Sequence, residues 1–261
     1  MRIALAQFAA STEPADNLAR VRWLAADAAA QDAELVVFPE AAMCSFARAR
    51  ADAAEPFDGP WATGVRQTAA DLGVTIVAGM FTTTGDDRVR NTLLVTGAAE
   101  ARYDKVHLFD ALGYAESAQI EPGTEAGAFT LGTHIIGLAT CYDIRFPGLF
   151  THLARLGADL VVVPTSWAPG PGKLHQWRTL ATARAMDSTA FIVGVDQSLS
   201  PSSEGSRRPT GVGHSIVVDP TGEVLLELGD ADELALVDLD LDLVADVRER
   251  LPVLRHARRL G

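Results

Sequence analysis

The stretch Ile135-Ile-Gly-Leu-Ala-Thr-Cys-Tyr-Asp-Ile-Arg-Phe-Pro147 joins an apolar run to the residues of a turn. The apolar run is typical of a buried strand, and the closing proline suits the first position of a helix. The sequence therefore predicts a strand over 134–140, which delivers Cys141 to a turn before a helix over about 148–156. Because ligands of open α/β sheets bind beyond the carboxyl ends of strands, Cys141 is a candidate nucleophile. The alternative is a buried cysteine that only fills space.

Strand and helix patterns alternate on both sides of this stretch. The first half predicts strands at 2–7, 34–38, 74–80, 91–96 and 101–107, with helices at about 15–31 and from Pro60 to Gly73. The second half adds a strand at 159–163, a helix at about 173–188, a strand at 190–196 and a hairpin of 213–219 and 222–228. Two halves with the same order of elements predict an α/β sandwich of two pseudo-symmetric halves, with helices on the outer faces of the sheets.

The chain has the length and composition of a globular protein. At 261 residues, with 48% hydrophobic and 21% charged residues, it can bury a large core, and we expect residues 1–261 to form a single domain. The segment Ser198–Pro209 is rich in polar residues and helix breakers, which predicts an exposed loop that could border a site.

The charge balance excludes several classes of partner. A formal charge of −12 and a pI near 4.9 disfavour nucleic acid and anionic membrane surfaces, since phosphate binding needs clustered Lys and Arg. We interpret the C-terminal arginines as a solvated or inter-subunit face; they are Arg248, Arg250, Arg255, Arg258 and Arg259. The first residues do not resemble a signal peptide, and no apolar run reaches membrane-spanning length, so a cytoplasmic location is expected.

The chain contains two cysteines, Cys44 and Cys141. Two cysteines cannot make a disulfide framework or a thiolate-rich zinc site, and no H-x-x-x-H or H-E-x-x-H pattern is present. No metal is therefore expected. For Cys44 we expect a packing role.

Two further predicted strand ends carry charged side chains. Glu40 follows the buried strand at 34–38, and Lys105 lies at the end of a hairpin strand. Charges beside buried strands are costly unless paired, so we expect the two side chains to meet near a polar pocket. The ammonium of Lys105 is also expected to lower the pKa of the Cys141 thiol, which is about 8.5 in model compounds.

Acyl transfer from an amide needs a nucleophile, a proton shuttle and a donor for the oxyanion. Cys141, Glu40 and Lys105 could supply them, with the backbone N–H of Tyr142 as a second oxyanion donor. Glu40 would take the thiol proton, pass it to ammonia and later activate water. A cysteine–histidine dyad is the alternative, although none of the six histidines lies in a motif that marks a base.

These residues lie in motifs that resemble the nitrilase superfamily of carbon–nitrogen hydrolases. The matching motifs are Phe38-Pro-Glu40, Tyr103-Asp-Lys-Val-His-Leu-Phe109, Thr140-Cys-Tyr-Asp-Ile-Arg-Phe-Pro147, Val163-Pro-Thr-Ser-Trp167, Trp177 to Ala185, Gly211 to Ser215 and Asp219-Pro-Thr-Gly222. The resemblance implies a Glu40–Lys105–Cys141 triad, and Glu116 as a second glutamate beside the lysine. It also implies an α-β-β-α sandwich that becomes a four-layer αββα-αββα assembly in a homodimer, without metal or organic cofactor.

Within the superfamily the motifs look most like the branch of ω-amidases and deaminated-glutathione amidases, which act on small amides that carry a carboxylate. Arg145 could bind such a carboxylate, or form a structural ion pair with Asp143 or another acid. Trp167 could line the pocket or fill the edge of the sandwich. After Pro164 the sequence departs from that branch, which leaves N-carbamoyl amides and nitriles open as substrates. A catalytically silent binding protein is the non-enzyme alternative, against which the intact Glu40, Lys105, Glu116 and Cys141 argue.

Overall fold

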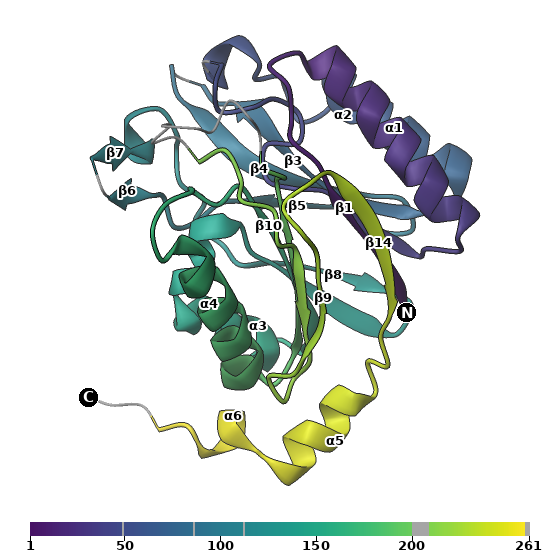
Figure 1. Cartoon of the computed structure of the whole chain (residues 1–261), viewed down its shortest axis with the longest axis vertical. Helices are drawn as coiled ribbons and strands as arrows, with labels where there is room; N and C mark the ends of the chain where they lie inside the picture. The colour runs from purple at the N-terminus through teal and green to yellow at the C-terminus, as the bar shows by residue number, and fades with distance from the viewer. Residues whose placement is uncertain (49, 86, 112, 200–208, 259–261) are drawn as a thin grey trace.

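Two β-sheets pack face to face, and helices cover their outer faces (Figure 1). The computed structural model describes residues 1–48, 50–85, 87–111, 113–199 and 209–258. The predicted α-β-β-α sandwich is confirmed. Most of the predicted loop at 198–209 lies outside the described residues, so that prediction stays open.

The first sheet combines the N-terminal half of the chain with one strand from the C-terminal part. Its order is β14-β1-β2-β3-β4-β5, with bounds Glu233–Asp238, Arg2–Gln7, Leu35–Val37, Thr75–Thr83, Val89–Thr96 and Ala101–Asp104. Strands β1, β2 and β3 are parallel, and the helices α1 (Pro14–Ala30) and α2 (Pro60–Leu72) connect them. Gly73 ends α2 in the left-handed conformation (φ 68°), as the sequence predicts.

The second sheet repeats this arrangement. Its order is β13-β12-β11-β10-β9-β8, with bounds Val224–Glu227, Ile216–Val218, Phe191–Asp196, Ala158–Thr165, His134–Leu138 and Gly127–Leu131. Strands β9, β10 and β11 are parallel, and α3 (Pro147–Arg155) and α4 (Lys173–Ser188) connect them. Both sheets therefore have three central parallel strands flanked by antiparallel ones, which confirms the predicted pseudo-symmetry.

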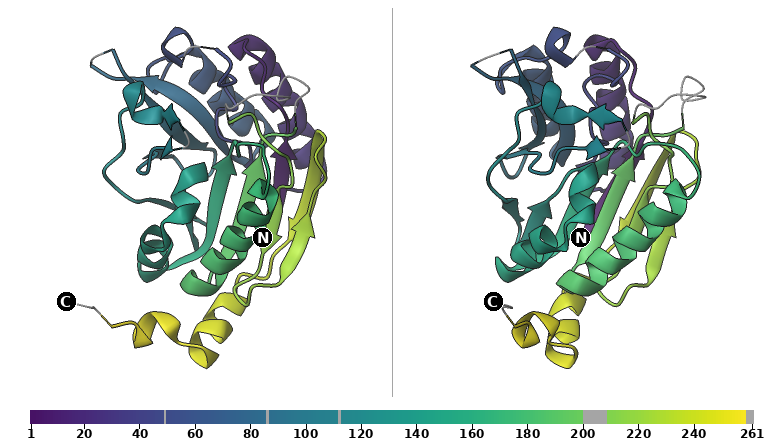
Figure 2. Two further views of the ribbon diagram at one scale, coloured as in Figure 1. Left: turned by 60° about the vertical axis from the view of Figure 1, so that its left-hand side comes forward. Right: turned by 90° about the vertical axis from the view of Figure 1, so that its left-hand side faces the viewer.

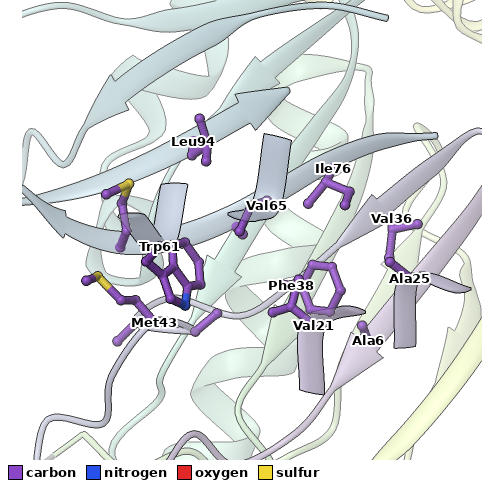
Figure 3. Packing of buried hydrophobic residues seen from close by; sticks show 14 of the residues in the cluster. Ala6, Val21, Ala25, Val36, Phe38, Met43, Trp61, Val65, Ile76 and Leu94 are labelled. Carbon is purple, nitrogen blue, oxygen red and sulfur yellow. The ribbon is translucent and has the colours of Figure 1, made fainter. Parts of the chain in front are cut away.

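Three hydrophobic layers result from this stacking. Ile3 and Leu5 of β1 point into the layer between the sheets, whereas Ala4 and Ala6 point toward α1 and α2. Figure 3 shows the layer under these helices, where Phe38 and Trp61 are among the larger side chains. A strand buried on both faces reads as a nearly continuous apolar run, which is the reason why the central strands are recognisable in the sequence.

The structure also contains elements that the sequence analysis did not predict. These are the edge strands β8 and β14, the two-residue strands β6 (Asp110–Ala111) and β7 (Tyr114–Ala115), and short 3-10 helices at Arg50–Asp52, Glu116–Ala118 and Cys141–Arg145. The helices α5 (Leu243–Arg250) and α6 (Val253–His256) follow β14 and extend beyond the sheets (Figure 2). Edge strands are partly exposed, so their apolar pattern is weaker than that of central strands.

Several predicted strands have different ends in the structure. The strand expected at 74–80 continues to Thr83, and the hairpin strand expected at 213–219 covers only Ile216–Val218. The strand expected at 101–107 stops at Asp104, and the strand expected at 159–163 continues to Thr165. No helix of the described residues is long and apolar enough to cross a lipid bilayer.

Candidate active site

One pocket collects all the residues that the sequence analysis selected. Its lining includes Glu40, Lys105, Glu116, Cys141, Tyr142, Arg145 and Trp167. Glu40 follows β2, Lys105 follows β5, and Cys141 follows β9 after two residues, so loops at strand ends build the site. The pocket is small: about 30 Å³ is open to the centre of a water molecule, whereas one water needs about 10–15 Å³. It therefore fits a compact substrate.

Cys141 occupies a strained turn between β9 and α3. Its φ of 46° lies in the left-handed region, which costs a non-glycine residue about 1–3 kcal/mol. The buried carboxylate of Asp143 supports this turn, because it accepts a hydrogen bond from the Thr140 N–H at 2.8 Å and one from the Tyr103 hydroxyl at 2.7 Å. The turn places the thiol at the strand end, on the pocket side.

A buried cluster of charges lies beside the thiol. Lys105 Nζ is 3.0 Å from Glu40 Oε1 and 2.9 Å from Glu116 Oε2, and the three residues are 2%, 1% and 3% exposed. Asn91 Nδ2 donates to Glu40 Oε1 at 2.7 Å and to Glu116 Oε1 at 3.4 Å. Each charge in the cluster therefore has an opposite charge or a dipole in contact, which makes its burial tolerable.

Ser166 connects the glutamate to the cysteine. Its backbone N–H donates to Glu40 Oε2 at 2.9 Å, and its carbonyl oxygen lies 3.7 Å from Cys141 Sγ. One carboxylate oxygen of Glu40 thus accepts from Lys105, and the other accepts from Ser166, the residue whose carbonyl oxygen lies near the Cys141 thiol.

Burial sets the protonation states in this cluster. Burial raises the pKa of the Glu40 carboxyl, and Lys105 offsets this effect only in part. Burial also raises the pKa of Cys141 well above its ordinary value; Glu40 raises it further, and Lys105 lowers it. Lys105 does lower the pKa of the thiol, as the sequence predicts, but removal from water outweighs the ammonium and the net shift is upward. Cys141 rests as a thiol.

Lys105 stays charged in spite of its burial. Removal from water opposes the ammonium, but Glu116 and Glu40 outweigh this penalty and raise the pKa of Lys105 well above its usual value. An ammonium with this environment is a permanent positive charge in the lining of the pocket.

The histidines are engaged elsewhere. No histidine is among the described residues that line the pocket. His107 Nδ1 lies 2.7 Å from Asp143 Oδ1, and its ring stacks on Phe146 with centroids 3.7 Å apart. His134 Nδ1 lies 3.1 Å from Asp159 Oδ2. This geometry disfavours a cysteine–histidine dyad.

Arg145 does not form the ion pair with Asp143 that was one of its two predicted roles. The oxygens of Asp143 accept from Tyr103, Thr140 and His107 instead. Arg145 donates to Gln176 Oε1 at 2.7 Å and lies over the Trp167 ring, with its guanidinium carbon 5.1 Å from the ring centroid. Its positive charge therefore faces the pocket.

Trp167 and Tyr142 form aromatic walls of the pocket. The Trp167 N–H donates to Asp196 Oδ1 at 2.8 Å, and its indole Nε1 donates to the Lys173 carbonyl at 2.9 Å. Tyr142 meets Phe109 edge to face, with centroids 5.0 Å apart. These contacts fix both rings in one orientation.

Several pocket residues were not selected from the sequence. They include Ser166, Lys173, Phe109 and Tyr114 in the lining. Asn91 was not selected either; it lies behind the lining, in contact with Glu40 and Glu116. Asn91 could have been selected from the sequence, because asparagine is uncommon inside an apolar strand. Among the described residues, no cluster of three or more His, Cys, Asp or Glu side chains has the arrangement of a metal site.

Known proteins resemble this chain over nearly its whole length. Residues 2–249 match the family model described as carbon-nitrogen hydrolase. A hydrolase of Mycobacterium tuberculosis is 47% identical over 266 residues, which cover 98% of this chain and 95% of that protein. The deaminated glutathione amidase of Escherichia coli O157:H7 is 32% identical over 267 residues, which cover 99% and 97%.

A solved structure extends the likeness to three dimensions. It is the amidase of Nesterenkonia sp. AN1, in a mutant with acrylamide added to its active-site cysteine. Its TM-score is 0.77 at 29% sequence identity, with 97% of this chain and 98% of that chain covered.

Proposed function

The chain belongs to the carbon–nitrogen hydrolase family, and on this premise we propose that it hydrolyses a small aliphatic amide that carries a carboxylate, through a thioester on Cys141. One observation carries the proposal. A thiol, a carboxylate with a raised pKa and a permanently charged ammonium line the same small pocket. This set matches the needs of acyl transfer from an amide.

In the first half-reaction, Glu40 accepts the thiol proton while the sulfur of Cys141 attacks the amide carbon. The carbonyl oxygen becomes an oxyanion, which Lys105 Nζ and the backbone N–H of Tyr142 stabilise. Glu40 then donates the proton to the amide nitrogen. The C–N bond breaks, ammonia leaves and the acyl group remains on sulfur.

In the second half-reaction, water replaces ammonia. Glu40 takes a proton from the water, whose oxygen attacks the thioester carbon. The same donors hold the second oxyanion. The C–S bond then breaks, the sulfur recovers the proton from Glu40, and the carboxylic acid product leaves. A carboxyl group with a raised pKa suits this work, because it can both accept and return a proton near neutral pH.

Glu116 and Asn91 act through the other members of the cluster. Glu116 accepts from Lys105 Nζ and, at 2.7 Å, from the Phe109 N–H, which fixes the ammonium in the pocket. Asn91 holds the two carboxylates at a distance by donating to both. We assign Arg145, Trp167 and Tyr142 to substrate binding.

The relatives support this assignment. A mutant of the amidase of Nesterenkonia sp. AN1 carries acrylamide on its active-site cysteine, which favours a cysteine nucleophile. A relative at 32% identity is a deaminated glutathione amidase. Both relatives are amidases, which favours an amide substrate for this chain.

Mass spectrometry of the intact protein tests the proposal. The protein is mixed with a panel of acidic amides, neutral amides, N-carbamoyl amides and nitriles, and acyl adducts and ammonia are followed. We expect a thioester adduct on Cys141 with at least one amide. The Cys141→Ala and Cys141→Ser variants should release no ammonia while keeping the thermal unfolding temperature of the parent. An active Cys141→Ala protein would refute the mechanism.

The reaction products distinguish an amide substrate from the alternative substrates. An N-carbamoyl substrate gives carbon dioxide together with ammonia, and a nitrile consumes two molecules of water. A protein that binds panel compounds, seen as a higher unfolding temperature, without any turnover or adduct would be the silent binding protein.

We further propose that the chain forms one domain and works as a homodimer. Strand β14, from the C-terminal part, pairs with β1 along Arg2 to Gln7, which supports a single folding unit. The homodimer is inferred from the family resemblance.

A further inference from the structure

The chain contains only two lysines, Lys105 and Lys173, and both line the pocket. Every other basic residue among the 22 Lys and Arg residues is an arginine. Lys105 belongs to the buried charge cluster. Lys173 begins α4 at the wall of the pocket that Trp167 forms, where its Nζ lies 5.9 Å from the Trp167 ring centroid and 5.7 Å from the Phe109 ring centroid.

Arg145 brings a second positive charge to the same wall. Its guanidinium carbon lies 5.1 Å from the Trp167 centroid and 6.0 Å from the Tyr142 centroid. Lys173 and Arg145 therefore both contact the Trp167 indole. Burial, and after it the repulsion from Arg145, lower the pKa of Lys173. Two like charges in this position oppose each other when the pocket holds no ligand.

Neither cation has an acidic partner among the described residues. The hydrogen bond of Arg145 goes to the neutral amide of Gln176, and no carboxylate of the described part of the chain lies within ion-pair distance of Lys173. Arginines outside the pocket behave differently. Arg2, Arg66 and Arg178 each pair with a carboxylate.

The formal charges of the pocket leave one positive charge unbalanced. Glu40 and Glu116 carry negative charge, Lys105, Arg145 and Lys173 carry positive charge, and Cys141 is a neutral thiol. A substrate with one carboxylate would bring the pocket to neutrality. Arg145 and Lys173 are both partly buried beside aromatic rings, and partial removal from water strengthens the attraction of a cation for an anion.

We propose that Lys173 is a specificity-determining residue, which together with Arg145 binds the carboxylate of the substrate over the Trp167 indole. The inference rests on the proposed amide hydrolysis. The amide end of the substrate lies at Cys141 and its carboxylate lies between the two cations. The small pocket restricts the chain between these ends to a few carbon atoms.

Matched substrates and variants test this role by kinetics. The substrates are monoamides of three- to five-carbon dicarboxylic acids and the corresponding neutral diamides. Lys173→Met keeps an unbranched apolar stem, one atom shorter than lysine, and removes the charge, and Lys173→Arg keeps the charge. Loss of one charge-assisted hydrogen bond should raise KM for the acidic amides about 10- to 100-fold, with kcat nearly unchanged. The diamides should change less than about twofold, and Lys173→Arg should restore most of the preference for acids.

Arg178→Met is the control. Arg178 lies on the same helix, α4, but it pairs with Glu227 outside the pocket. Its replacement removes one positive charge from α4 and should leave the ratio of kcat/KM for acidic and neutral amides unchanged. If Lys173→Met lowers kcat/KM equally for acids and diamides, Lys173 only packs against Trp167 and the inference is wrong.

A binding measurement separates this inference from the proposed function. Reductive methylation with ¹³C-formaldehyde labels the lysines and the N-terminal amine, so the NMR spectrum has few signals, and the Lys173 signal is the one that Lys173→Met lacks. Succinate should shift this signal at millimolar concentration, and butyramide should not. An unmoved signal overturns the role of Lys173 even in an active enzyme. Absence of turnover and of any Cys141 adduct would instead refute the proposed function, while the titration would still report on Lys173.

Discussion

Glu40 and Cys141 illustrate at the residue scale how burial controls chemistry. Both side chains are buried, and burial raises the pKa of each because it penalises the charged form. The Glu40 carboxylate takes up a proton readily, whereas the Cys141 thiol gives up its proton reluctantly. Proton transfer from Cys141 to Glu40 should therefore occur while the sulfur attacks the substrate, and not beforehand to form a resting thiolate. The proposed mechanism therefore predicts a distinct dependence on pH.

The first prediction concerns this pH dependence. Because Glu40 must be ionised in the free enzyme and its pKa is raised, kcat/KM for a neutral amide should fall as pH decreases through that raised pKa. The acid limb should lie above the pH of about 4.3 that an ordinary glutamate would give. Glu40→Gln should lower kcat/KM by about 10²- to 10⁴-fold. An acid limb at or below pH 4.3 in the parent enzyme would contradict this role.

The second prediction concerns Asn91. In Asn91→Asp a third carboxylate would lie next to Glu40 and Glu116, where the amide now donates to both. We expect a loss of about 3 kcal/mol in the free energy of unfolding at neutral pH. The two glutamates should raise the folded-state pKa of the new carboxyl, so the loss should begin above its unfolded pKa of about 3.9 and grow with pH. Unfolding by urea at pH 4 and pH 7 measures this, and an equal loss at both values would contradict it.

At the scale of elements, the turn that carries Glu40 depends on a close approach to β3. Gly79 of β3 has no side chain, and a Cβ there would lie 2.5 Å from the Ala41 nitrogen and 2.8 Å from Glu40 Cα. The Met43 N–H also donates to the Gly79 carbonyl at 2.9 Å. The backbone of this turn therefore rests directly on the strand.

The third prediction follows from this contact. Gly79→Ala should displace the Glu40 turn, lower the free energy of unfolding by about 1–3 kcal/mol and reduce kcat. Gly148→Ala is the control, because Gly148 lies exposed near the start of α3 with no atom within 4 Å of a Cβ. That change should leave kcat unaltered and slightly increase stability. Thermal unfolding and ammonia release measure both variants. Unchanged stability and kcat in Gly79→Ala would contradict the prediction, because they would show that the turn accommodates the added methyl group.

At the scale of the whole molecule, the two sheets place their strand ends around one pocket. Residues after β2 and β5 come from the first sheet, and those after β9 and β10 come from the second. The site thus depends on the packing of one half against the other. Strand β14 completes the first sheet beside β1, where Arg2 contacts Asp238 at 2.9 Å.

The fourth prediction concerns assembly. We expect a mass in solution of about twice the 27.7 kDa of one chain, measured by light scattering after size-exclusion chromatography. If the dimer stabilises the fold, the thermal unfolding temperature should rise with protein concentration. A monomer with full activity at micromolar concentration would contradict the homodimer.

The sequence determined the central elements and the three strand-end residues Glu40, Lys105 and Cys141. Central strands are buried on both faces, and glycine and proline mark their ends, so this information is local. The edge strands β8 and β14 were missed because a partly exposed strand needs fewer apolar residues. The partner of β14, strand β1, is also distant in the chain.

Only the tertiary structure decided how these residues act together. Single residues do not reveal their own burial, and burial raises the pKa of Cys141 in spite of the decrease that Lys105 causes. Folding also brought Asn91 and Ser166 to Glu40, from which both lie far apart in sequence. The physical reason is that charge–charge energies depend on distance and on removal from water, and both are properties of the folded chain.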